Sequence, residues 1–537
     1  MIKKTLIILA LCITLLWHFL PLNSPPGFTA DEAAFGYNAY SILQTGRDEY
    51  GTIFPLRLKS FGDYKLPLYT YLSAPIIKVF GLSEFSTRIV AGISALVIVV
   101  GIYFLTKALF GSELVSIIAL YFATFSPWIN TIARQAHETV LATALITVAL
   151  YLLIRFVQSS KEKYLWSFLA TLPFILFAYH TGKTIVPALF VISMFFFIQK
   201  GTVKKLRSKN FLMLVCIFVF ALGTSLFLIG EKQTPAQRVK NLFILNNPDI
   251  SLKTTEAKIE ERFSPFRVKL IVGMQEITKR YMSYFSPEFL TQHGDVNNRF
   301  GYPNISPISL LEYLGFIVGL LALARKWKPE YVVLLTLLFV APLNGALTWQ
   351  EYTLTRVYPL IIVLLPLSAY GVVSLFQSPR LRFVPYVLTG AVLFGSSMSL
   401  FYYFVHYPKK AIVIRSVQAG YQELTVYIKT NYSKYDHFFI TKDNGQPYIY
   451  LLFYLQYPPQ GYQTIARLSP PDVYGFGQVE GFDKFTFSTD SYNSKTLTPH
   501  SVYVFSQDSG RVARVPEDSV KKIKVSTEEM FWIYENP

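Results

Sequence analysis

Two adjacent carboxylates, Asp31 and Glu32, stand in the segment FTADEAAFGYNAYSILQTG, shortly after the first apolar run of the chain. Thr29 followed three residues later by Glu32 is a capping-box pattern, so we expect a helix to begin at Thr29. In such a box the Glu32 side chain binds the Thr29 amide. This gives Glu32 a structural explanation that does not extend to Asp31.

Asp31 has the position and chemistry of a catalytic base. It heads a row at helical spacing that we expect to form the buried face of the helix: Asp31, Phe35, Ala39 and Ile42. Burial raises the pKa of a carboxylate, whereas a helix N-terminus favours its charged form. A carboxylate in that setting suits the removal of a proton from an attacking hydroxyl. The alternative is an acid that interacts only with the helix dipole.

A lysine follows in the stretch FGDYKLPLYTYL. Pro67 is suited to open a helix, which leaves Asp63 and Lys65 just ahead of the helix N-terminus. A lysine beside a helix N-terminus makes a good pocket for an anion, particularly phosphate. The alternative is a lysine that extends to lipid headgroups.

The stretch SPWINTIARQAHETV places Arg134, His137 and Glu138 three and four residues apart. If the segment is helical, these side chains share one face. The alternative is an interfacial belt around Trp128 with a simple Arg134–Glu138 ion pair.

Two further stretches place cations at the ends of apolar runs. AYHTGKTIVP puts His180 and Lys183 in a tight turn, where Lys183 is either a substrate contact or an interfacial anchor. In EYTLTRVYPLIIVLLP, Arg356 lies just inside an apolar run, where an ionisable residue is a functional candidate. Extension of Arg356 to the membrane surface is the alternative.

The stretch SYFSPEFLTQHGDVNNRFGYP adds His293, Asp295 and Arg299. The three residue types suit a polar cavity. The alternative is an ordinary polar surface loop.

The elements that must position these residues are membrane helices. The chain has 537 residues, of which 52% are hydrophobic and only 15% charged, against roughly a quarter charged in soluble proteins. A bilayer core needs about 20 mostly apolar residues per helix. We expect eleven spans, near residues 5–22, 86–109, 113–130, 138–157, 164–179, 184–199, 211–229, 307–324, 331–348, 354–376 and 384–405.

Lysine and arginine gather in the short loops that follow the even-numbered spans, which predicts that these loops are cytoplasmic. Lys3 and Lys4 then also lie inside, and the first run is expected to be a span because no small-residue cleavage site follows it. The formal net charge of +17 is explained by these loops, without nucleic acid as a partner. Cys12 and Cys216 fall in apolar runs and are expected to be packing residues.

This plan divides the chain at residue 405. Residues 1–405 are expected to form an all-α polytopic membrane bundle with long outer loops at 23–85 and 230–306. Residues 406–537 turn polar and are expected to form a soluble extracytoplasmic α/β domain, with DHFFIT and SVYVFSQ as strands. The stretches KKAIVIRSVQAGYQELTVYIKT and PYIYLLFYLQY are expected to be helical.

On this plan every candidate residue falls on the outer side of the membrane. Acids together with lysine, arginine and histidine suit a substrate that has a phosphate to neutralise and a hydroxyl to deprotonate. One alternative is a transporter or flippase of a lipid-linked sugar, although the sequence lacks the paired inverted repeats typical of transporters. Another is a non-catalytic membrane scaffold, which leaves the acid–lysine pattern unexplained.

The quoted residues resemble the membrane glycosyltransferases of the GT-C class. Within this class the chain is similar to the protein O-mannosyltransferases and the bacterial lipid A aminoarabinose transferases, and it therefore resembles glycosyltransferase family 39. Asp31-Glu32 with Phe35-Gly36 is similar to the DE-x-x-FG pattern, and KLPLYTYL is similar to the KPPLxxxL motif. The bacterial relatives also share the SPW…R…E, YH…VP and FSP…F…GD-N stretches. The resemblance covers most of residues 1–405 and extends more loosely into the tail.

The resemblance implies transfer of a sugar from a polyprenyl-phosphate carrier to a hydroxyl of a protein, lipid or glycan acceptor outside the cytoplasm, with inversion. Asp31 would be the base, and Glu32 would support it or cap the helix. Lys65 would bind the lipid phosphate, helped by Arg356, Arg134 or Lys183. Multi-pass insertion in the plasma (inner) membrane follows.

No divalent metal is expected. The metal-dependent oligosaccharyltransferases of the same broad class use additional acidic motifs in their outer loops. Asp295 and Glu288 are the nearest candidates in this sequence, and they do not form a convincing set of oxygen ligands.

Overall fold

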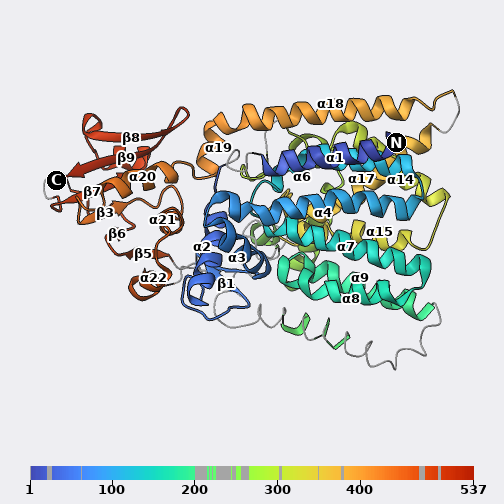
Figure 1. Ribbon diagram of the computed structural model, residues 1–537, viewed down its shortest axis with the longest axis horizontal. Coiled ribbons are helices and arrows are strands. Elements are labelled where there is room, and N and C mark those ends of the chain that lie inside the picture. The colour runs from blue at the N-terminus through green and yellow to red at the C-terminus, as the bar shows by residue number, and fades with distance from the viewer. Residues whose placement is uncertain are drawn as a thin grey trace. The chain divides into compact units, whose positions relative to one another are not determined.

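The computed structural model describes residues 2–20, 27–61, 63–199, 215–216, 218–219, 222–224, 244, 250–255, 265–301, 305–348, 350–376, 380–470, 478–493 and 497–537. These residues form two compact units (Figure 1). Unit 1 comprises Met1–Leu20 and Ala91–Tyr403, and unit 2 comprises Pro21–Val90 and Phe404–Pro537.

Unit 1 is a bundle of apolar helices that run roughly parallel (Figure 1). Its helices are α1 (Ile2–Phe19), α4 (Glu84–Phe110, whose first residues belong to unit 2), α5 (Glu113–Phe125), α6 (Pro127–Ile132), α7 (Glu138–Ser159), α8 (Glu162–Ala178), α9 (Gly182–Gln199), α13 (Pro265–Ser283), η3 (Phe289–His293), α14 (Leu310–Arg325), α15 (Tyr331–Val340), α16 (Leu343–Ala346), η4 (Tyr358–Leu360), α17 (Ile361–Leu375) and α18 (Val384–Val405).

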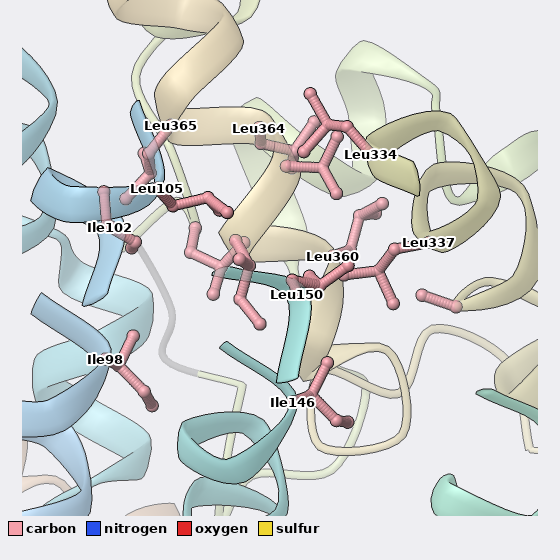
Figure 2. Close-up of a cluster of buried hydrophobic side chains, with 14 of the residues drawn as sticks. Ile98, Ile102, Leu105, Ile146, Leu150, Leu334, Leu337, Leu360, Leu364 and Leu365 are labelled. Atoms are coloured by element: carbon pink, nitrogen blue, oxygen red, sulfur yellow. The ribbon is translucent and has the colours of Figure 1, made fainter. Parts of the chain in front are cut away.

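Branched apolar side chains fill the centre of unit 1 (Figure 2). They include Ile98 on α4, Leu150 on α7, Leu337 on α15 and Leu364 on α17. Helices α14 and α17 pack closely because their contact consists of glycines and backbone. A Cβ atom on Gly371 would lie 1.9 Å from the Gly315 carbonyl oxygen, so only glycine allows this approach.

Five helices within the described residues are long and apolar enough to cross a membrane. They are Glu84–Phe110, Glu138–Ser159, Gly182–Gln199, Tyr358–Leu375 and Val384–Lys409, and each coincides with a predicted span. Helices α1, α8 and α14 coincide with three more predicted spans. The chain is therefore a multi-pass membrane protein.

Two predicted spans are interrupted. The run 113–130 breaks between α5 and α6, where Ser126 caps a new helix that has proline in its first turn. The run 331–348 breaks at Pro342, between α15 and α16. Most of the predicted span 211–229 and much of the loop 230–306 lie outside the described residues. The count of eleven spans therefore stays a prediction.

Unit 2 joins the first predicted outer loop to the tail. Its N-terminal part has α2 (Ala30–Thr45), an antiparallel hairpin of β1 (Leu58–Ser60) and β2 (Asp63–Lys65), and α3 (Leu68–Phe80). Its C-terminal part has η5 (Tyr407–Lys409), α19 (Ala411–Ser416), α20 (Tyr421–Asn431), β3 (His437–Ile440), α21 (Pro447–Leu455), α22 (Pro459–Ile465), β4 (Arg467–Leu468), β5 (Val479–Phe482), β6 (Phe485–Thr486), β7 (Ser501–Phe505), α23 (Gln507–Val512), η6 (Glu517–Ser519), β8 (Val520–Val525) and β9 (Glu528–Asn536).

The C-terminal strands form one mixed sheet in the order β4-β5-β6-β3-β7-β9-β8, with β3 parallel to β6 and β7. Strand β7 is buried along its whole length, as expected of a central strand covered on both faces. The predicted strands DHFFIT and SVYVFSQ are confirmed as β3 and β7. The first predicted helical stretch divides at Gly420, which has a φ of 95°.

Helix α2 and the tail share a single core. Phe28, Ala33 and Tyr37 belong to the same buried cluster as Leu452 and Phe453 of α21. The compact unit of the tail thus includes residues 21–90, and the predicted boundary at residue 405 stays a prediction.

Candidate active site

The predicted capping box at the start of α2 is confirmed. The Glu32 amide donates to the Thr29 hydroxyl at 3.4 Å, and the Glu32 carboxylate accepts from the Thr29 amide at 3.0 Å. Helix α2 therefore begins at Ala30, with Thr29 as its N-cap. The sequence placed this helix start within one residue, because the box is a purely local pattern.

The expected burial of Asp31 is wrong. Phe35, Ala39 and Ile42 are buried as expected, but the Asp31 side chain is 48% exposed. Glu32, which is 1% exposed, is the buried member of the pair. Successive helix positions differ by about 100°, so the cap that turns Glu32 inward leaves Asp31 at the edge of the buried face.

A buried arginine explains why Glu32 tolerates burial. The Arg88 Nε lies 2.7 Å from Glu32 Oε1, and its Nη2 lies 3.1 Å from Glu32 Oε2. Arg88 also donates to the Gly27 carbonyl. The bidentate pair pins the start of α2 to the start of α4 within unit 2. Arg88 was not identified from the sequence. Its position inside the predicted span 86–109 could have indicated it, because an ionisable residue in a membrane span is a functional candidate.

Asp31 and Lys65 are in contact. The sequence predicts them separately, Asp31 as the base and Lys65 as the phosphate ligand. The Lys65 Nζ lies 2.7 Å from Asp31 Oδ1 and also donates to the Asp31 carbonyl at 3.3 Å. It stands 4.5 Å from the centre of the Phe35 ring and 5.2 Å from that of Phe61. The Lys65 side chain is only 12% exposed, so it is not extended toward lipid.

Local structure accounts for this placement. The hairpin β1–β2 ends at Lys65, and α3 begins after Pro67, as the sequence predicted. Asp63 begins β2 and pairs in register with Ser60. We call Asp31, Lys65, Phe35 and Phe61 the Lys65 cluster.

A second acid pair, Asp48 and Glu49, lies buried in the same unit. Burial, together with the neighbouring Asp48 charge, raises the pKa of Glu49 to about 8. The Tyr448 hydroxyl donates to Glu49 Oε1 at 3.2 Å, and the Glu49 amide donates to Asn38 Oδ1 at 2.9 Å. Sequence reasoning missed this pair. Its signal was the stretch GRDEYG, which repeats the Asp-Glu pattern of residues 31–32.

In unit 1, cations gather near the turn between α8 and α9. The Lys183 Nζ lies 3.1 Å from His180 Nδ1, and Thr184 donates to Asn344 at 2.7 Å. Arg356 donates to the hydroxyl of Thr348. These contacts join the turn at 180–184 and the segments around 344 and 356.

Asp295 belongs to the same region of unit 1. Its carboxylate accepts from the amides of Asn297 at 2.9 Å and Leu354 at 2.7 Å. Burial raises the pKa of Asp295 to about 7, although these hydrogen bonds and the Arg356 charge oppose the rise. Asp295 thus ties its loop to the segment that leads into Arg356.

His137 caps α7 and lies among aromatic rings. Its Nδ1 accepts from the Thr139 amide at 3.1 Å, and its ring meets Tyr179 and Phe300 edge to face at 5.6 and 5.3 Å. Together these contacts define the Arg356 cluster, which comprises His137, His180, Lys183, Asp295 and Arg356.

The remaining candidates are placed differently. Arg134 is buried and donates to the carbonyls of Trp17 and Leu20, which satisfies the end of α1. The backbone carbonyl of Arg299 accepts from Gln135 at 2.9 Å. Glu138 is the first residue of α7, and His293 ends η3 with its side chain exposed. Among the described residues, no group of three His, Cys, Asp or Glu side chains comes together as a metal ion requires.

Part of the chain matches one family model. Residues 65–227 match the family model of dolichyl-phosphate-mannose-protein mannosyltransferases. No curated protein matches the chain in sequence.

Two solved structures cover almost the whole chain. ArnT from Cupriavidus metallidurans in the apo state is 11% identical, with a TM-score of 0.57 over 99% of this chain and 98% of ArnT. The same ArnT bound to undecaprenyl phosphate is 12% identical, with a TM-score of 0.55 over 98% and 97%. The resemblance predicted from the sequence is confirmed, and the chain has the GT-C glycosyltransferase fold.

Proposed function

We propose that this protein is a membrane glycosyltransferase that moves a sugar from a polyprenyl-phosphate carrier to a hydroxyl group of a protein, lipid or glycan acceptor at the outer face. The observation that carries the proposal is the contact between the half-exposed Asp31 carboxylate and the caged Lys65 ammonium. The match to the mannosyltransferase model and the likeness to an ArnT that binds undecaprenyl phosphate support it.

Lys65 supplies the charge that a phosphate leaving group needs. When the anomeric C–O bond breaks, its electron pair stays on the phosphate oxygen, and a fixed cation stabilises that charge without reorganisation. Phe35 and Phe61 hold the ammonium in place and limit its hydration. The leaving group is the polyprenyl phosphate itself.

Asp31 supplies the base. Its exposed carboxylate accepts the proton of the acceptor hydroxyl while that oxygen forms a bond to the anomeric carbon. Attack from the face opposite the phosphate inverts the configuration of the sugar. Lys65 pairs with Asp31, so a donor phosphate that binds Lys65 also releases the base.

The other candidates receive separate roles. Glu32 fixes the start of α2 through Thr29 and Arg88, which sets the direction of Asp31. In unit 1, Lys183 and Arg356 give the Arg356 cluster two cations, which suits an anionic part of a substrate. Arg134 holds the end of α1.

We also propose a membrane location for the protein and a transfer without a cofactor. The protein resides in the plasma membrane with its N-terminus in the cytoplasm and its C-terminal segment outside, as the placement of lysine and arginine indicates. The transfer uses no divalent metal, because Lys65 provides the charge for the leaving group.

The test uses purified full-length protein in nanodiscs with a panel of polyprenyl-phosphate sugars and a mixture of hydroxyl acceptors. We expect release of polyprenyl phosphate together with labelling of an acceptor. A parallel assay in liposomes follows movement of the donor across the bilayer. Donor movement without release of polyprenyl phosphate would replace this proposal with a transporter or flippase.

A further inference from the structure

Helix α21 of the tail brings one tyrosine into contact with the surroundings of Lys65. Tyr448 is buried, and its ring meets the Phe61 ring edge to face at 6.0 Å. Phe61 is in turn one of the two rings that hold the Lys65 ammonium. The position of the Phe61 ring therefore depends on a residue almost 400 positions away in the chain.

The hydroxyl of the same tyrosine reaches the buried acid pair. It donates to Glu49 Oε1 at 3.2 Å and lies 3.3 Å from the Tyr50 hydroxyl. The Lys65 charge acts on Glu49, so the two groups are electrostatically coupled. Tyr448 thus contacts both the Phe61 ring beside Lys65 and the buried carboxyl of Glu49.

The carboxyl group of Glu49 has hydrogen-bonding capacity that the described residues do not use. Its Oε2 has no hydrogen-bond partner among the described residues, and the same holds for Oδ2 of Asp48 and the hydroxyl of Tyr462. A buried polar group without a partner is rare in a site that serves packing alone. The titratable groups that face Glu49 are Tyr37, Asp48, Tyr50, Lys65, Tyr448 and Tyr462.

We propose that Tyr448 and Glu49 position Lys65 for the phosphate of the lipid donor, which makes the C-terminal segment a part of the donor site. Tyr448 fixes the Phe61 ring, and Glu49 in its neutral form leaves the Lys65 charge available to the phosphate. When Glu49 is charged, it competes with the phosphate for Lys65. This inference rests on the proposed function, because it takes Lys65 as the phosphate ligand.

The pKa of Glu49, about 8, sets the pH at which the competition begins. Below that pH Glu49 is neutral and donor binding is undisturbed. Above it, Glu49 carries a negative charge that attracts the Lys65 ammonium, and donor binding weakens. The hydrogen bond from Tyr448 lowers the pKa of Glu49, so its loss moves the weakening to higher pH.

The experiment measures binding of undecaprenyl phosphate to full-length protein in nanodiscs between pH 6 and pH 9. The variants are Tyr448→Phe, Glu49→Gln and Lys65→Gln. Tyr421→Phe is the matched control, because Tyr421 is also buried and donates one hydrogen bond, to the Asn444 carbonyl, but does not touch Phe61 or Glu49. Thermal unfolding midpoints are recorded for every variant.

We expect wild type to bind more weakly as the pH rises from 7 to 9. Glu49→Gln should match wild type at pH 6 and lose this weakening, which separates Glu49 from titration of the phosphate itself. Tyr448→Phe keeps the ring that contacts Phe61, so at pH 7 it should bind as Tyr421→Phe does. Its weakening should begin at higher pH than in wild type, so that it binds more tightly than Tyr421→Phe near pH 9.

Two results would overturn the inference. One is the same pH profile for wild type and Glu49→Gln, a comparison that stands even if Tyr448→Phe does not fold. The other is binding by Tyr448→Phe that equals Tyr421→Phe at every pH. Failure of wild type itself to bind undecaprenyl phosphate would instead reject the proposed function, and the inference with it.

Discussion

Unit 2 contains two Asp-Glu pairs of the same sequence in opposite environments. In the first pair, Glu32 is buried against the guanidinium of Arg88 and Asp31 is half exposed against Lys65. In the second pair, both carboxyls are buried, and neither has a salt-bridge partner among the described residues. Burial then raises the pKa values of both Asp48 and Glu49. The partner that the fold supplies, rather than the residue type, sets the environment of each carboxyl.

The largest effect on stability should come from breaking the first pair. We expect Arg88→Met to destabilise the fold by about 3–5 kcal/mol, because it leaves the Glu32 carboxylate buried without its cation. Thermal unfolding in detergent measures the loss. The control is Lys107→Met, which breaks an exposed pair with Glu113 at 2.9 Å and should destabilise the fold far less, because solvent screens an exposed ion pair. Equal losses for the two variants would show that burial of the Glu32 pair is unimportant.

Two lysines of the β1–β2 hairpin, Lys65 and Lys59, also differ in the partner that the fold supplies. Lys65→Gln should lower kcat/KM for the lipid donor by about 100-fold or more, as expected when a group that stabilises a leaving group's charge is removed. Lys59→Gln is the matched control, since Lys59 lies on β1, 4.7 Å from the Tyr50 ring centre, and its pairing is with an aromatic ring rather than Asp31. We expect Lys59→Gln to change kcat/KM less than threefold. A similar loss in both variants would remove Lys65 from the chemistry.

These environments were predictable only in part from the sequence. The capping box, the helix after Pro67 and strands β3 and β7 depend on local patterns and were correctly predicted. The exposure of Asp31, the Arg88–Glu32 pair and the contact between Tyr448 and Glu49 depend on segments far apart in the chain. Periodicity predicted the buried face of α2 but not the exposure of Asp31 at its edge. The cap and a distant arginine together set the rotation of the first turn.

The second pair should make stability depend on pH. The pKa of Glu49 is about 8 in the folded protein, against 4.5 when unperturbed, so the folded state binds more protons than the unfolded state between these values. Its contribution to stability therefore decreases as the pH rises through this window, by at most about 1.4 kcal/mol per pH unit. We expect the unfolding temperature of wild type to fall from pH 5 to pH 8 more steeply than that of Glu49→Gln. Parallel curves would show that the pKa of Glu49 is not raised in the folded protein.

The smallest expected effect is that of a chelator. If Lys65 supplies the positive charge for the leaving group, excess EDTA should leave turnover unchanged within error, and added Mg²⁺ or Mn²⁺ should not raise it. Loss of turnover with EDTA that returns on addition of one metal would contradict the metal-free scheme.

The most direct test of the account separates chemistry from binding at Asp31. Turnover of a polyprenyl-phosphate sugar and binding of undecaprenyl phosphate are measured for wild type and Asp31→Asn in the same nanodiscs. The account predicts that Asp31→Asn loses turnover by about 100- to 10,000-fold, as for loss of a general base. It should bind the lipid phosphate at least as tightly, because Lys65 no longer pairs with a carboxylate. Unchanged turnover in Asp31→Asn, or lost binding with turnover restored at saturating donor, would show that Asp31 is not the base.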